Sequence, residues 1–332
     1  MKNSDKNFYA NFYETYIKYA CMQWLQRAFL YKELVQLIGE DISMLEIGPG
    51  TGDVAALIAQ SVTRSGKVFS YRSIDKLAEY AHAPQERLRA VGAHAISITR
   101  DDAFTYPTGE ILTQDVQLEP GQKFDLILCE HVLYGLLAKH GTSEVASAAL
   151  KPYFEALSKY GLFVNVLSDK SDSDALRIRS ASVQAPIDIY RTLMRNQKGY
   201  TFEVPVSAEL LFPSIDLDFW NKLATGSYDY ASESKCFKDA HDLVTFFGSN
   251  LEQMRESGQV QDYLHRFQKL LREKNGKMTL NVVVFISTAS DSEEFVKALA
   301  RAIAQAEIKL KAYAPVTLVD LDKVRILPHL HN

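Results

Sequence analysis

The segment Ser43–Gln60 constrains the fold most, because a short apolar strand, a glycine-rich turn and the start of a helix follow one another without a break. Three glycines at alternate positions from Gly48 to Gly52 let the backbone turn sharply and approach a ligand closely, beside the free N–H groups of a helix start. A dinucleotide fingerprint would need its third glycine at position 53, which is Asp53, and the Gly-Lys-Ser/Thr of a phosphate loop is absent. The acidic Glu46 before the glycines suits a ligand with a cationic amino-acid end rather than a pyrophosphate.

Strand-like and helical stretches alternate along the chain. Strands are expected at residues 43–48, 67–75, 94–99, 124–130, 161–168, 200–206, 210–217 and 278–287, helices at 8–38, 77–91, 145–159, 185–196, 219–274 and 290–312, and an extended segment at 316–326. Strands separated by helices imply βαβ units and a mainly parallel sheet whose ligands bind at the carboxyl ends of the strands. The pattern therefore predicts a doubly wound α/β fold with a helical insertion before its last strand.

Acidic residues follow two further strands of the predicted sheet. Asp75 closes the second strand, where its carboxylate could accept both hydroxyls of a ribose. Arg100-Asp101-Asp102-Ala103 follows the third strand, where an acidic side chain could reach an adenine amino group. Together with Glu46 and the glycine turn, these positions indicate S-adenosylmethionine as the cofactor.

These residues resemble those of the class I S-adenosylmethionine-dependent methyltransferases. The resemblance covers residues 43 to about 170 and is carried by Leu45–Gly52, Asp75, Asp101-Asp102 and Phe124–Glu130. It implies a Rossmann-like methyltransferase fold of seven strands, whose last strand, expected at residues 279–287, is antiparallel. Because the methyl group of the cofactor is already activated, no metal is expected.

A narrower resemblance, over residues 5–288, is to histamine N-methyltransferase and its relatives. It is carried by Cys21-Met22-Gln23, by Glu130–Tyr134 after the fourth strand, by Val166–Ser168 and by Asn281 before an apolar run. The resemblance implies that Gly48, Asp75 and Glu130 contact the cofactor, that His131 lies near the acceptor, and that Asn281 meets the substrate amine.

One position departs from that family, because Lys18 stands where the family has its amine-binding glutamate. A lysine that faces the pocket would repel a protonated amine and favour an anionic group. A lysine that points to solvent would take no part in recognition. Both interpretations of Lys18 stay open at this point.

Two side chains after the fourth strand are candidates for catalysis. His131 could accept a proton from the acceptor, since an unperturbed imidazole has a pKa of about 6.5, or it could be a pocket wall that transfers no proton. Tyr134, one helical turn along, could orient the acceptor or pack in the core. Three aromatic residues near the start of the chain, Tyr9, Phe12 and Tyr13, could close over a planar or cationic acceptor. They could equally be the apolar face of a helix that packs against the core.

Composition and charge exclude several other functions. The 37 Lys and Arg against 41 Asp and Glu give a net charge of −4, which supplies no basic surface for nucleic acid. No apolar run reaches the roughly 18 residues of a membrane-spanning helix, and the first residues contain no apolar signal core. Three widely spaced cysteines do not make a disulfide framework. We therefore expect a cytoplasmic protein that binds neither nucleic acid nor membrane, with a monomer favoured and the oligomeric state open.

The sequence as a whole predicts an S-adenosylmethionine-dependent methyltransferase that acts on a small molecule by N-methylation. O- or C-methylation of an acid-bearing metabolite and a non-catalytic cofactor-binding scaffold are the alternatives. Residues 1–40 are expected as a helical lid, 41–288 as the methyltransferase domain with its insertion at 219–276, and 289–332 as a C-terminal helix and tail. The expected cofactor contacts are Glu46, Gly48, Gly50, Gly52, Asp75, Asp101, Asp102, Ala103 and Glu130, and the expected acceptor contacts are Tyr9, Phe12, Tyr13, Lys18, His131 and Asn281.

Overall fold

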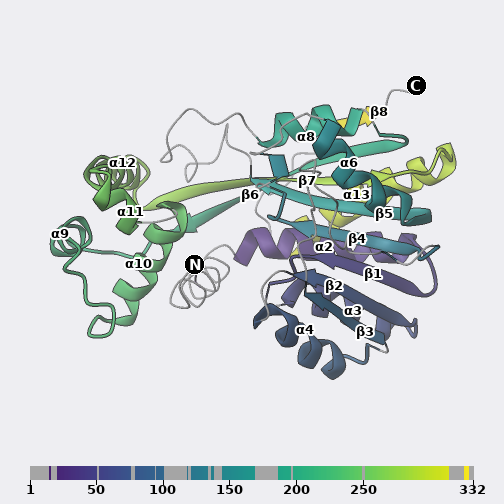
Figure 1. Cartoon of the computed structure of the whole chain (residues 1–332), viewed down its shortest axis with the longest axis horizontal. Coiled ribbons are helices and arrows are strands. Elements are labelled where there is room, and N and C mark those ends of the chain that lie inside the picture. The colour runs from purple at the N-terminus through teal and green to yellow at the C-terminus, as the bar shows by residue number, and fades with distance from the viewer. Residues whose placement is uncertain are drawn as a thin grey trace, which may run out of the picture. The chain divides into compact units, whose positions relative to one another are not determined.

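The computed structural model describes residues 15, 21–50, 52–75, 79–93, 95–100, 118, 121–133, 136–137, 144–168, 186–195, 197–248, 251–313 and 325–328. Strands and helices alternate through much of this part of the chain (Figure 1). In order they are α2 (Cys21–Leu37), β1 (Ile42–Ile47), α3 (Asp53–Arg64), β2 (Phe69–Asp75), α4 (Glu79–Ala90), β3 (Ala95–Arg100), β4 (Phe124–Glu130), α6 (Glu144–Glu155), β5 (Leu157–Ser168), α8 (Pro186–Arg195), β6 (Tyr200–Leu211), α9 (Leu217–Thr225), α10 (Lys235–Gly248), α11 (Leu251–Glu256), α12 (Val260–Glu273), β7 (Lys277–Thr288), α13 (Glu293–Tyr313) and β8 (Arg325–Pro328).

The strands form one sheet in the order β3-β2-β1-β4-β5-β7-β6-β8 (Figure 1). The pairs β2–β3, β1–β2, β1–β4 and β4–β5 are parallel, whereas β7 is antiparallel to β5. This confirms the mainly parallel α/β sheet and the antiparallel strand near its end. The direction of chain progression reverses between β1 and β4, so the carboxyl ends of these two strands define the topological switch point where such sheets bind ligands.

The sheet also differs from the sequence prediction in three places. Residues 157–159 were expected to be helical but belong to β5, where Phe124 pairs with Leu157 and Leu126 with Leu162 across a bulge. Gly161 permits this close approach, since a Cβ atom there would lie 2.7 Å from the carbonyl oxygen of Phe124. Residues 212–216, expected to be a strand, lead instead into α9, whose N-cap Asp216 accepts a hydrogen bond from the Phe219 N–H at 2.9 Å. The two expected strands at 200–206 and 210–217 are replaced by the single strand β6, and β8 pairs with β6, so the sheet has eight strands where the family resemblance implied seven.

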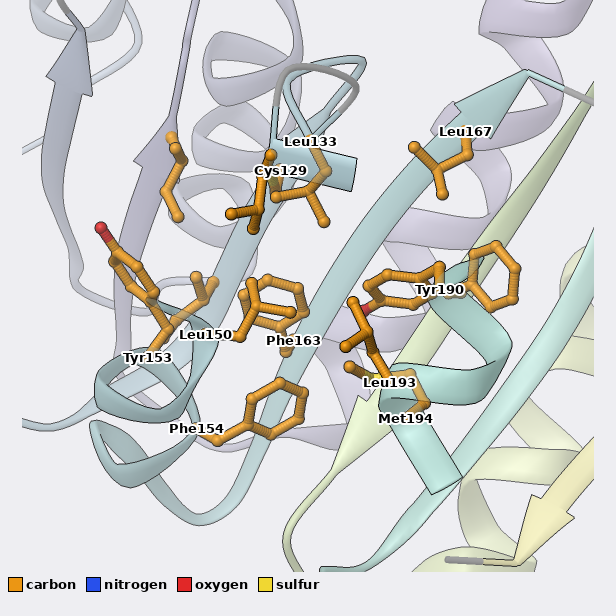
Figure 2. Close-up of a cluster of buried hydrophobic side chains, with 14 of the residues drawn as sticks. Cys129, Leu133, Leu150, Tyr153, Phe154, Phe163, Leu167, Tyr190, Leu193 and Met194 are labelled. Carbon is orange, nitrogen blue, oxygen red and sulfur yellow. The ribbon is translucent and has the colours of Figure 1, made fainter. Parts of the chain in front are cut away.

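The chain divides into two compact units. The first, here called the sheet unit, holds the described parts of 26–168, 184–206 and 282–332. Its core packs the sheet against α6 and α8, with Phe163 stacked on Phe154 at 5.0 Å between ring centroids (Figure 2). Tyr190 of α8 is tilted on Phe285 of β7 at 4.7 Å between ring centroids. Cys129 and Leu133 belong to the same cluster, so packing fixes the carboxyl end of β4, which lies at the switch point.

The second, here called the helical unit, holds the described parts of 1–25 and 207–281. Helices α9 to α12 surround a core in which Phe267 is fully buried, and they occupy the place of the expected insertion between the last two strands. Asp242 of α10 is buried and accepts hydrogen bonds from the Thr15 hydroxyl at 2.9 Å and the Tyr230 hydroxyl at 3.1 Å. Thr15, which was expected in a separate lid, is therefore held by the helical insertion.

Helix α2 from residue 26 onward belongs to the sheet unit and is largely buried. Leu30, Leu34 and Val35 are at most 3% exposed. This part of the expected lid is thus a core element, because its apolar face packs rather than lying open over a site. None of the helices in the described part of the chain is both long and apolar enough to cross a membrane.

Candidate active site

The glycine turn follows β1 directly and leads into α3. The N–H of Gly48 donates to the carbonyl of Ile74 in β2 at 2.9 Å, and the N–H of Gly52 donates to the carbonyl of Pro49 at 2.9 Å. Gly48, Gly50 and Gly52 have φ values of 68°, 54° and 74°, in the left-handed region that other residues rarely adopt. The turn therefore needs glycine at all three positions for its backbone conformation alone.

The turn also needs glycine because two neighbours enclose it. A Cβ atom on Gly48 would lie 2.5 Å from the Val132 Cγ2 atom, in the segment that follows β4. A Cβ atom on Gly52 would lie 2.7 Å from Cβ and 2.8 Å from Cα of Pro84 in α4. The turn is thus closely packed at the switch point, with the first turn of α3 beginning at Asp53. A backbone of this kind beside a helix N-terminus fits the amino-acid end of S-adenosylmethionine.

Two acids lie at the ends of β1 and β2. Glu46 is 4% exposed and accepts a hydrogen bond from the Tyr71 hydroxyl at 2.6 Å. Burial raises the pKa of the Glu46 carboxyl to about 8, the Tyr71 hydrogen bond opposes this, and the nearby charges of Glu130 and Asp75 raise the pKa further. Asp75 is the last residue of β2 and is partly exposed, as a contact to a ribose requires.

Glu130, the last residue of β4, is held by two side chains of α2. Arg27 donates from Nη1 to Glu130 Oε2 at 2.8 Å, and Tyr31 donates its hydroxyl to Oε1. The side chains of Arg27 and Glu130 are only 4% and 8% exposed. Neither partner of Glu130 is predicted by the sequence analysis above. An arginine and a tyrosine four positions apart in an apolar helix are nevertheless a signal, because buried polar side chains of this kind usually have a polar partner.

His131 follows Glu130 with a φ of 56°, and its N–H donates to the carbonyl of Val166 in β5 at 3.0 Å. The residue as a whole is partly exposed, but its Nε2 atom is shielded from solvent. Burial, and then the positive charge of Arg27, lower the pKa of His131 to about 3. The imidazole is therefore neutral near pH 7 and a poor proton acceptor, which argues against the general-base role and favours the pocket-wall alternative.

The other expected site residues fall into two groups. Asn281, in the helical unit, accepts a hydrogen bond at Oδ1 from the Ser207 hydroxyl at 2.6 Å. The remaining residues lie outside the part of the chain that the structure describes; they are Tyr9, Phe12, Tyr13, Lys18, Asp101, Asp102, Ala103 and Tyr134. The structure thus brings together Glu46, the three glycines, Asp75, Glu130 and His131 in the sheet unit.

The two shifted pKa values predict opposite pH dependences of stability. Glu46 has its pKa raised in the folded state, so the native protein binds more protons than the unfolded chain between about pH 4.5 and 8, and stability falls as pH rises through that window. His131 has its pKa lowered, so its contribution to stability is lost as pH falls below about 6.5. The stability of Glu46→Gln relative to the wild type should therefore increase as the pH rises from 5 to 9. The stability of His131→Gln relative to the wild type should increase as the pH falls from 7 to 4. Urea unfolding across these ranges measures both trends, and a constant difference for either variant would contradict the burial assigned to that side chain.

The sheet order, the antiparallel β7 and the glycine turn at the switch point are those of the class I methyltransferase fold. The sequence profile of the protein-L-isoaspartate(D-aspartate) O-methyltransferase family matches residues 16–106, which include the glycine turn and Asp75 but make up less than a third of the chain. The protein is an S-adenosylmethionine-dependent methyltransferase. Its narrower resemblance to histamine N-methyltransferase stays a prediction.

Solved structures with similar folds include several methyltransferases. A protein from Bacillus halodurans C-125 is 12% identical, with 78% of this chain and 98% of that chain covered and a TM-score of 0.40. The plantazolicin methyltransferase BpumL, in complex with S-adenosylhomocysteine, is 14% identical, with 87% and 91% covered and a TM-score of 0.41. Coclaurine N-methyltransferase is 12% identical, with 79% and 72% covered and a TM-score of 0.38. The comparison with curated proteins finds no match.

Proposed function

We propose that this methyltransferase transfers a methyl group from S-adenosylmethionine to a nitrogen atom of a small molecule. The observation that supports this is that the described residues named at the site leave no net positive charge at the switch point. The guanidinium of Arg27 is paired with the Glu130 carboxylate, the Glu46 carboxyl, with its pKa raised to about 8, is largely protonated near pH 7, and Asp75 is a further acidic group. A site without excess positive charge gives a carboxylate no electrostatic advantage over an amine. The proposal agrees with the acceptor class that the narrower family resemblance implies.

In this proposal the chain's own residues bind and orient rather than carry protons. The cofactor supplies an activated methyl group, so the protein has mainly to align the acceptor and exclude water. The glycine turn receives the amino-acid end and Asp75 accepts the ribose hydroxyls. His131, held neutral, offers a hydrogen bond to the acceptor without taking up its proton, so the amine has to reach its neutral form by another route.

O-methylation of an acid-bearing metabolite is the second candidate, and one finding favours it. The family profile that matches residues 16–106 is that of an O-methyltransferase. The match includes the glycine turn and Asp75 but not Glu130 or His131, which the narrower resemblance places at the cofactor and near the acceptor. It therefore supports the cofactor more directly than the methylated atom.

A calorimetric screen separates the two candidates. Small aromatic and aliphatic amines are titrated into the protein saturated with S-adenosylhomocysteine, alongside carboxylates of matched size, and compounds that bind are assayed for methyl transfer from radiolabelled S-adenosylmethionine. The proposal expects binding and methylation of amines. Binding of carboxylates alone would contradict it, and binding without any methyl transfer would favour a scaffold that no longer turns over.

Asp75→Ala tests the ribose contact. Loss of a carboxylate that accepts two hydroxyl groups should weaken S-adenosylhomocysteine binding by on the order of 1.5 to 3 kcal/mol. Asp41→Ala is the matched control, because Asp41 accepts a hydrogen bond from the Val68 N–H at the opposite end of β1, at 3.1 Å. Calorimetry should show unchanged affinity for the control. Equal affinity of Asp75→Ala and the wild type would place the ribose elsewhere.

A further inference from the structure

Glu130 ends β4 and is followed by His131 and Val132. These three residues, here called the β4 corner, are contacted by three different parts of the sheet unit. Helix α2 binds the Glu130 carboxylate through Arg27 and Tyr31. Strand β5 accepts the His131 N–H at 3.0 Å. The glycine turn lies against Val132 so closely that Gly48 has no room for a side chain. The β4 corner therefore links α2 to the turn that receives the cofactor.

The contact between α2 and the β4 corner is built for a fixed geometry. Arg27 and Tyr31 lie one helical turn apart on the same face of α2, and they are 3% and 2% exposed. Both carboxylate oxygens of Glu130 accept from α2, one from each donor. Removing either member of a buried ion pair leaves its partner as an uncompensated charge, so Arg27 and Glu130 act as a unit.

The backbone of the corner is in a conformation that its surroundings have to maintain. His131 has a φ of 56°, a left-handed value that is unfavourable for a residue with a side chain. Such residues persist where neighbouring contacts over-determine them, and they gather at functional sites. Here the Glu130 contacts lie immediately before His131, and the packing of Val132 on Gly48 lies immediately after it.

We propose that Arg27 and Tyr31 are positioning residues of the cofactor site, which act through Glu130 to hold the β4 corner against the glycine turn. The proposal rests on the assignment of S-adenosylmethionine to that turn. It gives the buried part of α2 a function beyond core packing, because α2 sets the conformation in which Val132 closes behind Gly48. It also assigns Glu130 a role that does not require direct contact with the cofactor.

The test compares S-adenosylhomocysteine binding by the full-length wild type, Arg27→Met, Tyr31→Phe, Glu130→Gln and the double variant Arg27→Met/Glu130→Gln. Lys309→Met is the matched control, because Lys309 of α13 pairs with Glu33 on α2 at 2.6 Å and does not contact Glu130. Calorimetry gives the affinity, and urea unfolding of each variant gives its stability separately. Arg27→Met should bind at least tenfold more weakly, Tyr31→Phe about threefold more weakly, and Lys309→Met should bind like the wild type.

The double variant separates positioning from general destabilisation. If Arg27 acts through Glu130, the two single losses are not additive, and the double variant should bind no more weakly than Arg27→Met. If both Arg27→Met and Tyr31→Phe bound S-adenosylhomocysteine with unchanged affinity and lost only stability, the positioning role would be overturned. If Arg27→Met does not fold, unchanged affinity of Tyr31→Phe is sufficient to overturn it. Additive losses in the double variant would also overturn it. A wild type that does not bind S-adenosylhomocysteine would overturn the cofactor assignment and the proposal with it, so the two failures are distinguishable.

Discussion

Gly52→Ala should abolish measurable S-adenosylhomocysteine binding and lower the free energy of unfolding by about 2 to 5 kcal/mol. A left-handed backbone costs about 1 to 2 kcal/mol for an alanine, and forcing a methyl group into a packed site adds about 1 to 3 kcal/mol. Both terms apply at Gly52, which has a φ of 74° and whose Cβ would lie 2.8 Å from the Pro84 backbone. Relief of the contact would have to move α4 or the turn, and either movement changes the backbone that receives the cofactor.

Gly66→Ala is the control for this substitution. Gly66 has a φ of 77°, close to that of Gly52, but a Cβ atom there would meet nothing within 4 Å. This variant should lose only the backbone contribution of about 1 to 2 kcal/mol and keep its affinity for S-adenosylhomocysteine. Urea unfolding and calorimetry measure the two effects. If Gly52→Ala and Gly66→Ala lost similar affinity for S-adenosylhomocysteine, or if neither lost any, the assignment of the glycine turn to the cofactor would be contradicted.

Phe285→Ala should lower the free energy of unfolding by about 3 to 5 kcal/mol, the range for removing a fully buried phenylalanine. Phe285 lies on the antiparallel strand β7, is not exposed, and packs against Tyr190 of α8. Its loss leaves a cavity between the sheet and α8 that the surrounding core can fill only in part. Protein that remains folded should still bind S-adenosylhomocysteine, because the glycine turn lies at the end of β1, and β4 and β5 separate β1 from β7.

The control for Phe285→Ala is Tyr160→Ala, which removes an aromatic ring that is 40% exposed. Surface substitutions usually change stability by about 0.5 kcal/mol or less, although the contact of Tyr160 with Phe295 at 5.0 Å places this variant somewhat above that value. Urea midpoints of the two variants give the comparison. A Phe285→Ala protein no less stable than Tyr160→Ala would show that β7 does not pack as described.

Features encoded by local sequence were predictable. The glycine turn follows from three residues in five positions, and β4 was predicted at Phe124–Glu130, the bounds that it has in the structure. The β-branched run of β7 was also predicted, as was the helical block before it. In each case the residues that determine the element lie within the element itself.

Features that depend on distant partners were not predictable in this way. Arg27 and Glu130 are 103 positions apart, so no local pattern joins them. The ordinary pKa of histidine suggested a proton acceptor at His131, whereas burial and the charge of Arg27 lower that pKa. Residues 157–159 read as the end of a helix, and only the pairing of Phe124 with Leu157 places them in β5. Each of these depends on tertiary contacts that override local preference.

The measurement that tests the central claim most directly is a calorimetric titration of the wild-type protein with S-adenosylhomocysteine, beside a parallel titration with NAD. The glycine turn, Asp75 and the reversal of strand order between β1 and β4 predict saturable binding of S-adenosylhomocysteine at one site per chain and no binding of NAD. Absence of S-adenosylhomocysteine binding, or saturable binding of NAD in its place, would contradict the assignment of this protein as an S-adenosylmethionine-dependent methyltransferase.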